Sequence, residues 1–575
     1  MQLSHTHKQN ILLIIFLGVL SFSLFSPIAS NDYIPKSSDF TNHIVNIIES
    51  KKALEEGQFP VRVAPSLYQG WRYPYYQFYA PLAYTFTGAV YKWLTPDNPF
   101  LAYKVTLWFF LIVGGWYIFR LTKELIYSES IALLTSVVFL LSPYLLLNMM
   151  TRGDLTESIA SCVVPAVLYY NIRFQRWPSI HLFFCMALAW FVLATTHILA
   201  FLTSVLFIGL FLTCYNIQEF IPLKRLLLAG LAFVFSILLA LWYFVPAVML
   251  EPYLYAHYML SNPYYYRWLN PLATLLSVSP VSPIPLPGNG QLLFPFYVSI
   301  GWPVLISAGY ILYKKIADPE TKIPPAITIF LCLFFLAVFL VWSPVNFWQF
   351  LPVFCKSIQF GFRFMLQIMW IGALLFAWMV SALFKNKIDT RHIVIGILLI
   401  GIANGAWLQT NQSSQYSVKE IIQAPRIAER SALLFVVRPD FLKTSEAYLP
   451  VEKTQTLCHQ EKTVTHCEFE ITKQQTLQLP VLFYPGMLDM KMNGQPISYK
   501  PIPSMKSDTP HSIFQIYPML ASIELSPGHY TITSQFIGVR WANVLSIGCW
   551  MIMLLWGIYS LLRYLCSFLK ASPRG

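Results

Sequence analysis

Charged residues are scarce in this sequence. Only 11% of its 575 residues are Asp, Glu, Lys or Arg, whereas 56% are hydrophobic and 16% are aromatic. Soluble globular domains have about 25% charged residues, which they need to cover their surface. The composition therefore excludes an ordinary soluble protein of this length and predicts a polytopic membrane protein.

Two classes of ligand-binding sequence are also missing. The chain has no G-x-x-x-x-G-K-[ST] phosphate loop and no G-x-G-x-x-G after an expected strand, which argues against ATP-driven and dinucleotide-dependent chemistry. The net charge is +13, but Lys and Arg occur in pairs between hydrophobic runs and form no single stripe. This distribution argues against a nucleic-acid partner and is typical of membrane topology signals.

Long hydrophobic runs dominate the chain. A helix rises about 1.5 Å per residue and needs about 20 apolar residues to cross a hydrocarbon layer. Twelve runs approach that length, so we predict a mainly α protein with about 12 transmembrane helices. The runs begin near Asn10, Leu101, Ile131, Glu157, Leu182, Ile198, Arg225, Leu293, Pro325, Phe364, His392 and Trp541.

Basic residues in the short connections predict the orientation of these helices. With the N-terminus inside, sixteen Lys and Arg fall in inner segments and four fall in short outer loops, and such a bias normally sets topology. Both termini are then cytoplasmic. The inner residues are Lys8, Arg120, Lys123, Arg173, Arg176, Lys224, Arg225, Lys314, Lys315, Lys322, Lys385, Lys387, Arg391, Arg563, Lys570 and Arg574, and the outer ones are Arg152, Arg267, Lys356 and Arg363.

Two hydrophobic segments allow a second interpretation. Counting residues 79–94 as a span would invert every later loop, so we interpret this segment as a helix in the outer membrane interface. The first run, residues 11–28, also resembles a secretory signal peptide. We favour an uncleaved signal anchor, because cleavage would leave eleven spans and an outside N-terminus.

Long outer segments divide the chain into three parts. We predict a transmembrane module over residues 1–408 with a large first outer loop at 30–100, a β-rich domain over 409–540, and a final helix with a cytoplasmic tail over 541–575. An Asn493-Gly494 turn signal and alternating hydrophobic residues indicate the strands. Another outer region, residues 251–290, is rich in Tyr and Pro, which suits interfacial anchoring or, less commonly, stacking on sugars.

Cysteine use predicts one disulfide. Most of the nine cysteines lie in hydrophobic runs, where a thiol acts as a small apolar group. Cys458 and Cys467 instead flank HQEKTVTH in the β-rich part, at a spacing that suits a cross-strand disulfide. His459 and His466 make a zinc site the alternative, which we disfavour because the short segment leaves little chain to wrap around a metal.

Ionisable residues gather at the outer ends of the runs. Asp39 and His43 follow the first run and are one helical turn apart, which places a carboxylate and an imidazole on one side of a helix. Arg152, Asp154 and Glu157 lie within six residues at the start of the fourth run. Charges at this depth are costly unless they pair or function. The alternative is a solvated Arg152–Asp154 pair beside a helix N-terminus that favours Glu157.

Two more ionisable residues mark outer turns. His197 falls between the fifth and sixth runs, where it either serves the site or hydrogen-bonds a helix end. Arg363 opens the tenth run and can bind a phosphate through its planar guanidinium. A side chain that extends to the membrane interface is the alternative for Arg363.

These residues lie in segments that resemble a known family. SDFTNHIVNIIESKKALEEGQFPVRVAPSLYQGWRYPYYQFYAPLAY resembles the first outer loop of the GT-C membrane glycosyltransferases. Within them it resembles the bacterial membrane proteins labelled 6-pyruvoyl-tetrahydropterin synthase-related, whose loop combines Asp-x-x-x-His, Gly-Gln-Phe-Pro and a Tyr-Pro-rich stretch. SPYLLLNMMTRGDLTES, THILA, IQFGFRFM and the last strand segments resemble later parts of that family. Nothing resembles a soluble pterin synthase, so the label does not indicate pterin chemistry.

The resemblance implies an activity and a set of site residues. It implies a bacterial inner-membrane enzyme with a periplasmic β-rich domain, which moves a sugar with inversion from a polyprenyl-phosphate donor to a lipid or glycan acceptor. Asp39 would be the catalytic base and Arg363 would bind the lipid phosphate. Residues that would bind donor or acceptor are His43, Tyr75, Tyr76, Arg152, Asp154, Glu157 and His197.

The chain departs from better-known relatives in its first loop, which has no Asp-x-Asp. Asp32 and Asp39 are seven residues apart, whereas hard divalent cations favour clustered carboxylates. We therefore predict no obligatory metal, with a divalent cation as the alternative. A transporter or flippase of lipid-linked glycans, or an inactive glycan-binding scaffold, is the alternative function. A transporter would place ionisable residues near the bilayer midplane.

Overall fold

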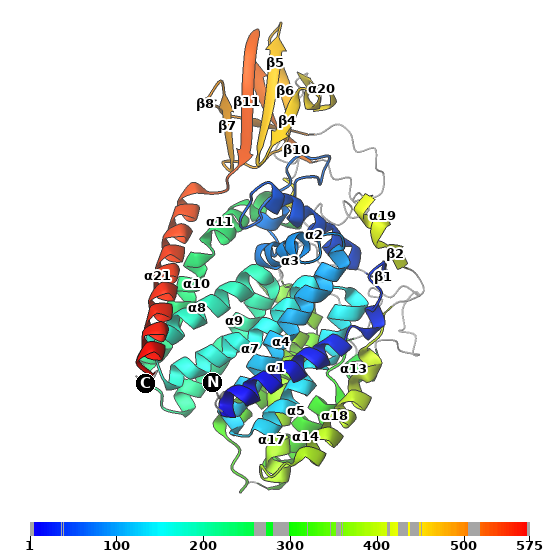
Figure 1. The fold of residues 1–575 in the computed structure, drawn as a ribbon, viewed down its shortest axis with the longest axis vertical. Helices are drawn as coiled ribbons and strands as arrows, with labels where there is room; N and C mark the ends of the chain where they lie inside the picture. The colour runs from blue at the N-terminus through cyan, green and yellow to red at the C-terminus, as the bar shows by residue number, and fades with distance from the viewer. Residues whose placement is uncertain are drawn as a thin grey trace.

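The computed structural model consists of a large helical bundle with β sheets standing on one end (Figure 1). It describes residues 5–35, 37, 39–257, 272–279, 298–318, 320–345, 347–351, 358, 360–410, 415–423, 435–437, 448–449, 451–503 and 518–571. Arg267, Lys356 and most of the Tyr- and Pro-rich region at 251–290 lie outside the described residues. The chain is therefore mainly helical, with a small C-terminal β-sheet region.

A helix lies in each of the twelve predicted hydrophobic runs. Several begin at residues that favour helix N-termini, such as Asn98, whose side chain accepts from the Leu101 amide. The twelve helices are α1 (His5–Ser23), α4 (Pro99–Ile126), α5 (Glu129–Leu140), α7 (Leu155–Arg176), α8 (Ile180–Thr196), α9 (Ile198–Gln218), α10 (Leu223–Leu239), α14 (Trp302–Ala317), α15 (Pro325–Trp342), α17 (Met365–Phe384), α18 (Thr390–Asn404) and α21 (Arg540–Ala571).

Fewer helices than predicted are long enough to span a membrane. Within the described residues, seven helices qualify by length and composition, or up to nine if each of two bent pairs counts as one span. The predicted count of about 12 is therefore not confirmed. Helices α1 and α8 are apolar but shorter, and α14 has only 16 residues and ends in Lys314 and Lys315.

Both bent pairs contain a break within a hydrophobic run. Helix α5 is followed by α6 (Pro143–Leu146) and η3 (Leu147–Arg152), at an angle of 41°. Ser142 precedes Pro143 and has an extended backbone (ψ 131°), because a residue before proline disfavours the helical conformation. Helix α10 is followed by α11 (Leu241–Leu250) at 74°.

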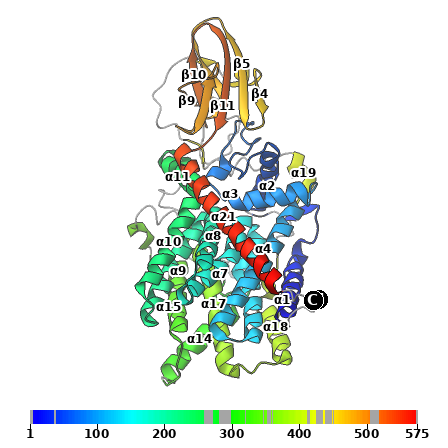
Figure 2. The same cartoon turned by 60° about the vertical axis from the view of Figure 1, so that its left-hand side comes forward.

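Two helices from the first outer loop lie between the bundle and the sheets (Figures 1 and 2). They are α2 (Phe40–Glu55) and α3 (Pro81–Trp93). They approach closely at Gly88, where an added Cβ would lie 2.2 Å from Ser50 Oγ. With 13 residues, α3 is too short to cross a hydrocarbon layer. That it lies in the membrane interface stays a prediction.

The C-terminal strands form two sheets around a common core. One sheet has the order β3-β6-β10-β9 and the other β4-β5-β11-β7-β8. Leu479 of β6, Ile523 of β10 and Ile532 of β11 belong to one buried cluster that both sheets share. The strands are β3 (Tyr448–Leu449), β4 (Cys458–Glu461), β5 (Val464–Ile471), β6 (Gln475–Leu482), β7 (Leu488–Met492), β8 (Gln495–Pro496), β9 (Lys500–Pro503), β10 (Met519–Leu525) and β11 (Gly528–Phe536).

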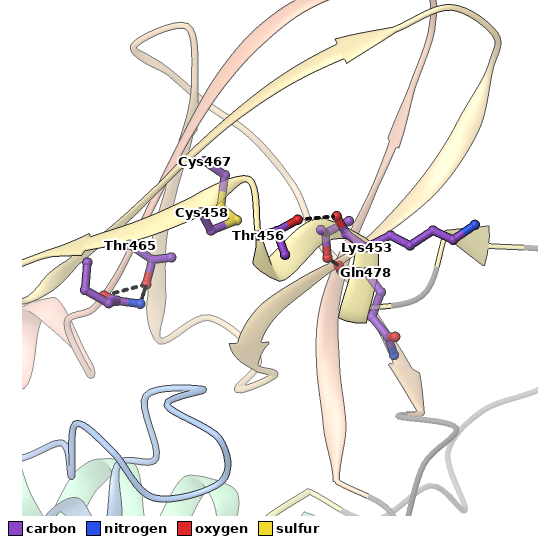
Figure 3. The surroundings of a disulfide bond; sticks show 8 residues. Lys453, Thr456, Cys458, Thr465, Cys467 and Gln478 are labelled. Atoms are coloured by element: carbon purple, nitrogen blue, oxygen red, sulfur yellow. Dashed lines mark hydrogen bonds between the residues drawn. A yellow bond between two sulfur atoms is a disulfide. The ribbon is translucent and has the colours of Figure 1, made fainter.

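A two-residue turn defines one hairpin of these sheets, and a disulfide joins the strands of another. Asn493 and Gly494 join β7 to β8 and both have positive φ, at 49° and 81°, as a two-residue hairpin turn requires. Cys458 and Cys467 are directly paired on β4 and β5 and are joined by a disulfide (Figure 3). Their sulfurs are therefore not free to ligate zinc, and the zinc alternative is wrong.

Late segments of the chain contact the first outer loop. Strand β1 (Tyr33–Pro35) pairs with β2 (Gln415–Ser417). Arg62 donates to the Ile537 carbonyl at 3.1 Å and to Asn543 Oδ1 at 2.9 Å. The loop that carries Asp39 is thus held by residues from the C-terminal part of the chain, although the three-part domain division stays a prediction.

Candidate active site

The N-terminus of α2 meets the segment before α7 at the end of the bundle that faces the sheets. The Asp39 amide donates to the Arg152 carbonyl at 3.1 Å. The Ser37 hydroxyl donates to the same carbonyl at 2.7 Å. Two parts of the chain that are more than 100 residues apart are thereby held in contact.

Gly153 makes this close approach between α2 and the segment before α7 achievable. Its φ is 73°, and a Cβ built on it would lie 2.2 Å from the Phe40 ring. Phe40 is fully buried, and its ring contacts Phe100 and Tyr103 at 5.9 and 5.3 Å between ring centroids. Only glycine combines this backbone conformation with so little space, so Gly153 fixes the position of the residue next to Asp39.

Arg152 is the centre of the cluster and contacts three carboxylates. Its Nη2 lies 2.9 Å from Asp154 Oδ2 and 3.3 Å from Asp39 Oδ2, and its Nη1 lies 3.1 Å from Glu157 Oε2. Nη1 also donates to Asn148 Oδ1 at 2.7 Å. Arg152 and Asp154 are buried, so the alternative of a solvated loop pair is wrong.

Asp154 is a fixed anion at the N-terminus of α7. Its Oδ1 accepts from the Glu157 amide at 2.9 Å and from the Thr156 hydroxyl at 3.1 Å. Burial alone would raise its pKa, but Arg152 and His43 outweigh burial and hold the pKa well below its usual value. The Asp154 carboxyl therefore stays ionised and fully hydrogen-bonded.

Glu157 is equally enclosed. Its side chain is 1% exposed, one carboxylate oxygen contacts Arg152, and the other accepts from the Tyr144 hydroxyl. It sits in the first turn of α7, where an anion is favoured by the helix dipole. Both of its oxygens are thus occupied within the protein.

Asp39 differs from the other two carboxylates. Its side chain is 31% exposed, against 5% for Asp154 and 1% for Glu157. It begins α2 but caps no amide there with its side chain. Partial burial and the nearby charge of Asp154 raise the pKa of Asp39, and together they outweigh the opposing charge of Arg152. Asp39 is therefore reachable and a better proton acceptor than Asp154.

His43 lies between the carboxylates and the tyrosines of the first loop. Its Nε2 is 3.5 Å from Asp154 Oδ1 and its Nδ1 is 2.8 Å from the Tyr84 hydroxyl. Tyr75 packs against Tyr84 with 6.0 Å between ring centroids. Tyr76 is fully buried and its hydroxyl donates to the Asn46 carbonyl, so Tyr76 has no donor left for a sugar.

His197 reaches the same cluster from the turn between α8 and α9. Its Nδ1 accepts from the Ala200 amide at 3.1 Å and so caps α9, as the helix-end alternative predicted. Burial lowers the pKa of His197 to about 4. Asp154, Glu157 and His197 each place one ligand atom within 4.8 Å of the others, which is close enough to hold a cation.

Arg363 borders the cluster and has unused hydrogen-bond donors. Its neighbour Phe362 lies under the Arg152 guanidinium, 5.3 Å from the ring centroid. Arg363 donates from Nη1 to the Ile358 carbonyl at 3.2 Å, while its Nε is buried without a partner among the described residues. Within that part of the chain it forms no ion pair, which leaves its guanidinium suited to an external anion.

Sequence reasoning missed several polar partners in this cluster. Tyr144 binds Glu157, Tyr79 hydrogen-bonds Thr156 at 2.8 Å, and Asn148 orients Arg152. Tyr144 and Asn148 lie in the segment SPYLLLNMMTRGDLTES that also contains the charged residues. The polar side chains of Tyr144 and Asn148 within a hydrophobic run were the only feature of the sequence that could have indicated these contacts.

The sequence matches the family model described as "6-pyruvoyl-tetrahydropterin synthase related domain; membrane protein" over residues 76–413. The match covers more than half of the chain. This protein belongs to that family of membrane proteins. The branch predicted from the first-loop motifs is thereby confirmed, and Asp39 and His43 lie before the matched region.

Other comparisons add a weak similarity. No curated protein matches the sequence. Among solved structures, the arabinofuranosyltransferase AftD from mycobacteria is similar, with 12% identity and a TM-score of 0.41 over 69% of this chain. This chain covers 26% of that one. A similarity of this size establishes neither a shared fold nor a shared activity.

Proposed function

We propose that this membrane protein is an inverting glycosyltransferase. It moves a sugar from a polyprenyl-phosphate donor to a lipid or glycan acceptor at the outer face of a bacterial inner membrane. The observation that carries the proposal is the contrast within the Arg152 cluster, where Asp39 is the one partly exposed carboxylate of three and the other two are buried. A partly exposed acid with a raised pKa, held beside a fixed cation, suits a general base.

The proposed reaction is a single displacement at the anomeric carbon. The Asp39 carboxylate takes the proton of the acceptor hydroxyl as that oxygen attacks. The bond from the anomeric carbon to the phosphate oxygen breaks, and its electron pair leaves with polyprenyl phosphate. Attack from the face opposite the leaving group inverts the sugar, and no nucleotide is needed because the lipid phosphate is the leaving group.

Arg363 is the proposed partner of that phosphate. Its position beside the cluster and its unused donors support this role. A guanidinium that meets the departing phosphate oxygens stabilises the charge that develops in the transition state. Arg152 is already committed to three carboxylates, so it acts as a positioning residue for Asp39.

A divalent cation is not required in this proposal. Asp154 and Glu157 belong to the group that could hold one, but Arg152 already contacts both. Each of their four carboxylate oxygens has a partner in the protein. A bound cation would supply Lewis-acid stabilisation of the phosphate; in this proposal the Arg363 guanidinium stabilises it instead, by its positive charge and its N–H donors.

The location of the charged cluster also bears on the alternative functions. Asp154 and Glu157 occupy the first turn of α7, and Asp39 begins α2 outside the hydrophobic runs. A transporter is expected to hold such groups midway along its helices. The cluster at one end of the bundle therefore favours chemistry at a membrane surface.

Mass spectrometry of envelope lipids and glycans, from cells with and without the gene for this protein, tests the proposal. We expect one glycan or lipid to lose a single sugar in the deletion strain. Complementation with Asp39→Asn should fail to restore it, although the variant protein is present in the membrane. Glu55→Gln, an exposed position at the other end of α2, is the matched control and should restore it. Restoration by Asp39→Asn would overturn the assigned base.

A further inference from the structure

A large basic cavity lies at the opposite end of the bundle from Asp39. Its volume is about 780 Å³, which is within the range of small-molecule sites. Helices α4, α7, α8 and α10 form it, and their short connections are those in which the bias of Lys and Arg predicts the cytoplasmic face. The lining includes four arginines, Arg120, Arg173, Arg176 and Arg225, together with several aromatic side chains.

Helix α7 relates this cavity to the Asp39 cluster. Asp154 caps the N-terminus of α7, and Arg173 and Arg176 lie in its last turn. Its 22 residues correspond to about 33 Å at the standard rise. The cavity and the cluster are therefore separated by about the thickness of a hydrocarbon layer, and they cannot share one small ligand.

The positive charge of the cavity is largely uncompensated. Among its described lining residues, none is acidic. Arg176 is neutralised by Glu124, with Nη1 3.3 Å from Oε1. Arg225 donates to the Gln175 and Arg176 carbonyls, which end α7. Arg120 and Arg173 form no ion pair within the part of the chain that the structure describes.

Arg120 and Arg173 are positioned together and keep free donors. Both donate to the Tyr169 hydroxyl, at 3.0 and 2.9 Å. Arg120 also lies over the Trp116 ring and Arg173 over the Trp177 ring, at 5.7 and 5.6 Å from the ring centroids. The Arg173 Nε is buried and has no hydrogen-bond partner among the described residues. Two preorganised guanidiniums with free N–H groups match a phosphate.

The rim of the cavity indicates that this phosphate is carried by a lipid. Trp177 is 54% exposed and Ile180, which begins α8, is 64% exposed. Tryptophan and aliphatic residues at a helix end are typical of the headgroup level of a bilayer. Basic pockets between transmembrane helices bind anionic headgroups.

We propose that this cavity binds the phosphate headgroup of an anionic phospholipid from the leaflet opposite the Asp39 cluster. Arg120 and Arg173 bind the phosphate, and Tyr169 holds the two guanidiniums at a fixed separation. This site is independent of the glycosyltransferase proposal, because it lies at the other end of α7. The occupancy of this site therefore depends on how much anionic phospholipid the membrane contains.

Native mass spectrometry of the full-length protein tests this proposal. The protein is taken from nanodiscs of phosphatidylcholine with or without phosphatidylglycerol. We expect retained phosphatidylglycerol in preference to phosphatidylcholine, and about tenfold weaker retention in Arg120→Gln/Arg173→Gln. Lys224→Gln/Lys315→Gln removes the same charge from exposed positions outside the cavity and should retain the lipid like the parent.

Two further arms decide between lipid and soluble phosphate and guard against misfolding. Inorganic pyrophosphate, added to the protein in detergent, should raise the melting temperature much less than phosphatidylglycerol does. A pyrophosphate effect without a lipid effect would overturn the lipid assignment. If Arg120→Gln/Arg173→Gln does not fold, the retention of phosphatidylglycerol is measured on Arg120→Lys/Arg173→Lys instead. That variant keeps both positive charges but loses the planar guanidinium groups, so it should retain less phosphatidylglycerol than the parent. Equal retention of phosphatidylglycerol and phosphatidylcholine by the parent would overturn the proposal. So would an equal loss of phosphatidylglycerol from Arg120→Gln/Arg173→Gln and from Lys224→Gln/Lys315→Gln.

Discussion

Asp39 and Arg152 are bonded to each other twice, once through the backbone and once through their side chains. The Asp39 amide donates to the Arg152 carbonyl at 3.1 Å, and Arg152 Nη2 lies 3.3 Å from Asp39 Oδ2. The backbone bond places the start of α2, and the ion pair turns the carboxylate toward the cluster. The orientation of the proposed base, Asp39, therefore depends on Arg152.

Replacing Arg152 should destabilise the protein strongly. In Arg152→Ala, Asp154 and Glu157 stay buried without their cation, and breaking a buried ion pair on one side costs about 3–5 kcal/mol. Thermal melting in detergent measures this loss. Arg391→Ala removes an exposed arginine at the start of α18 and should change the unfolding free energy by less than about 0.5 kcal/mol. Equal melting temperatures of the two variants would contradict the central role of Arg152.

Replacing Arg363 should reduce sugar transfer without unfolding the protein. Within the residues that the structure describes, the Arg363 side chain has one hydrogen bond, to the Ile358 carbonyl, so Arg363→Gln loses little stability. Loss of one preorganised donor to developing charge lowers the rate about 100-fold. Initial rates of transfer from a synthetic polyprenyl-phosphate sugar measure the effect, and Arg363→Lys should recover part of it. An unchanged rate in Arg363→Gln would remove this residue from the phosphate site.

His197 should make the stability of the protein depend on pH. Its pKa is about 4 in the folded protein and about 6.5 when unfolded. Between these values the unfolded chain binds more protons, so the unfolding free energy falls as the pH falls. The expected loss from pH 7 to pH 5 is about 2 kcal/mol.

The variant His197→Asn isolates this contribution to the pH dependence. Asn can still cap α9 but does not titrate, so its melting temperature should fall less between pH 7 and pH 5. His529→Asn replaces a histidine whose side chain is 81% exposed, and should keep the full pH dependence of the parent. If His197→Asn also keeps it, another group is responsible.

Gly153→Ala should displace Phe40 and with it Asp39. The positive φ costs about 1 kcal/mol, and the clash with the Phe40 ring adds about 1–3 kcal/mol. Gly57→Ala is the matched control, because Gly57 also has a positive φ of 91° but nothing lies within 4 Å of an added Cβ. Melting temperature and transfer rate should fall more in Gly153→Ala. Equal effects would mean that backbone strain alone is responsible.

Removal of divalent cations should leave transfer intact. Arg152 contacts both Asp154 and Glu157, and these are the two carboxylates that could bind a metal together with His197. Transfer assayed in excess EDTA, and again after adding Mg²⁺ or Mn²⁺, should proceed at one rate. A rate that vanishes in EDTA and returns with either ion would show that a cation shares the site with Arg152.

The helices could be predicted from the sequence because their signals are local. Ser179 begins α8 by accepting from the Leu182 amide, and Asp154 begins α7 in the same way. Their capacity to span a membrane was harder to predict. A break before Pro143 and the 16-residue length of α14 depend on where each helix ends, which hydrophobicity alone does not determine.

The site was predictable as a set of charges but not as a set of contacts. Charge at the ends of hydrophobic runs singled out Asp39, Arg152 and Glu157, since isolated charges there are costly. Nothing local indicates that His197 lies within reach of Asp154, because packing of α8 and α9 against α7 determines it. Likewise the sequence YPYY does not reveal that the Tyr76 hydroxyl donates its hydrogen bond to the Asn46 carbonyl.

The bonds from Arg62 to Ile537 and Asn543 have a consequence for biogenesis. Arg62 is synthesised hundreds of residues before these partners. The first loop can therefore form these hydrogen bonds only after the start of the last helix has been made. A polypeptide that terminates before Ile537 lacks both hydrogen bonds, and its first loop therefore has no contact from Arg62 to the last helix.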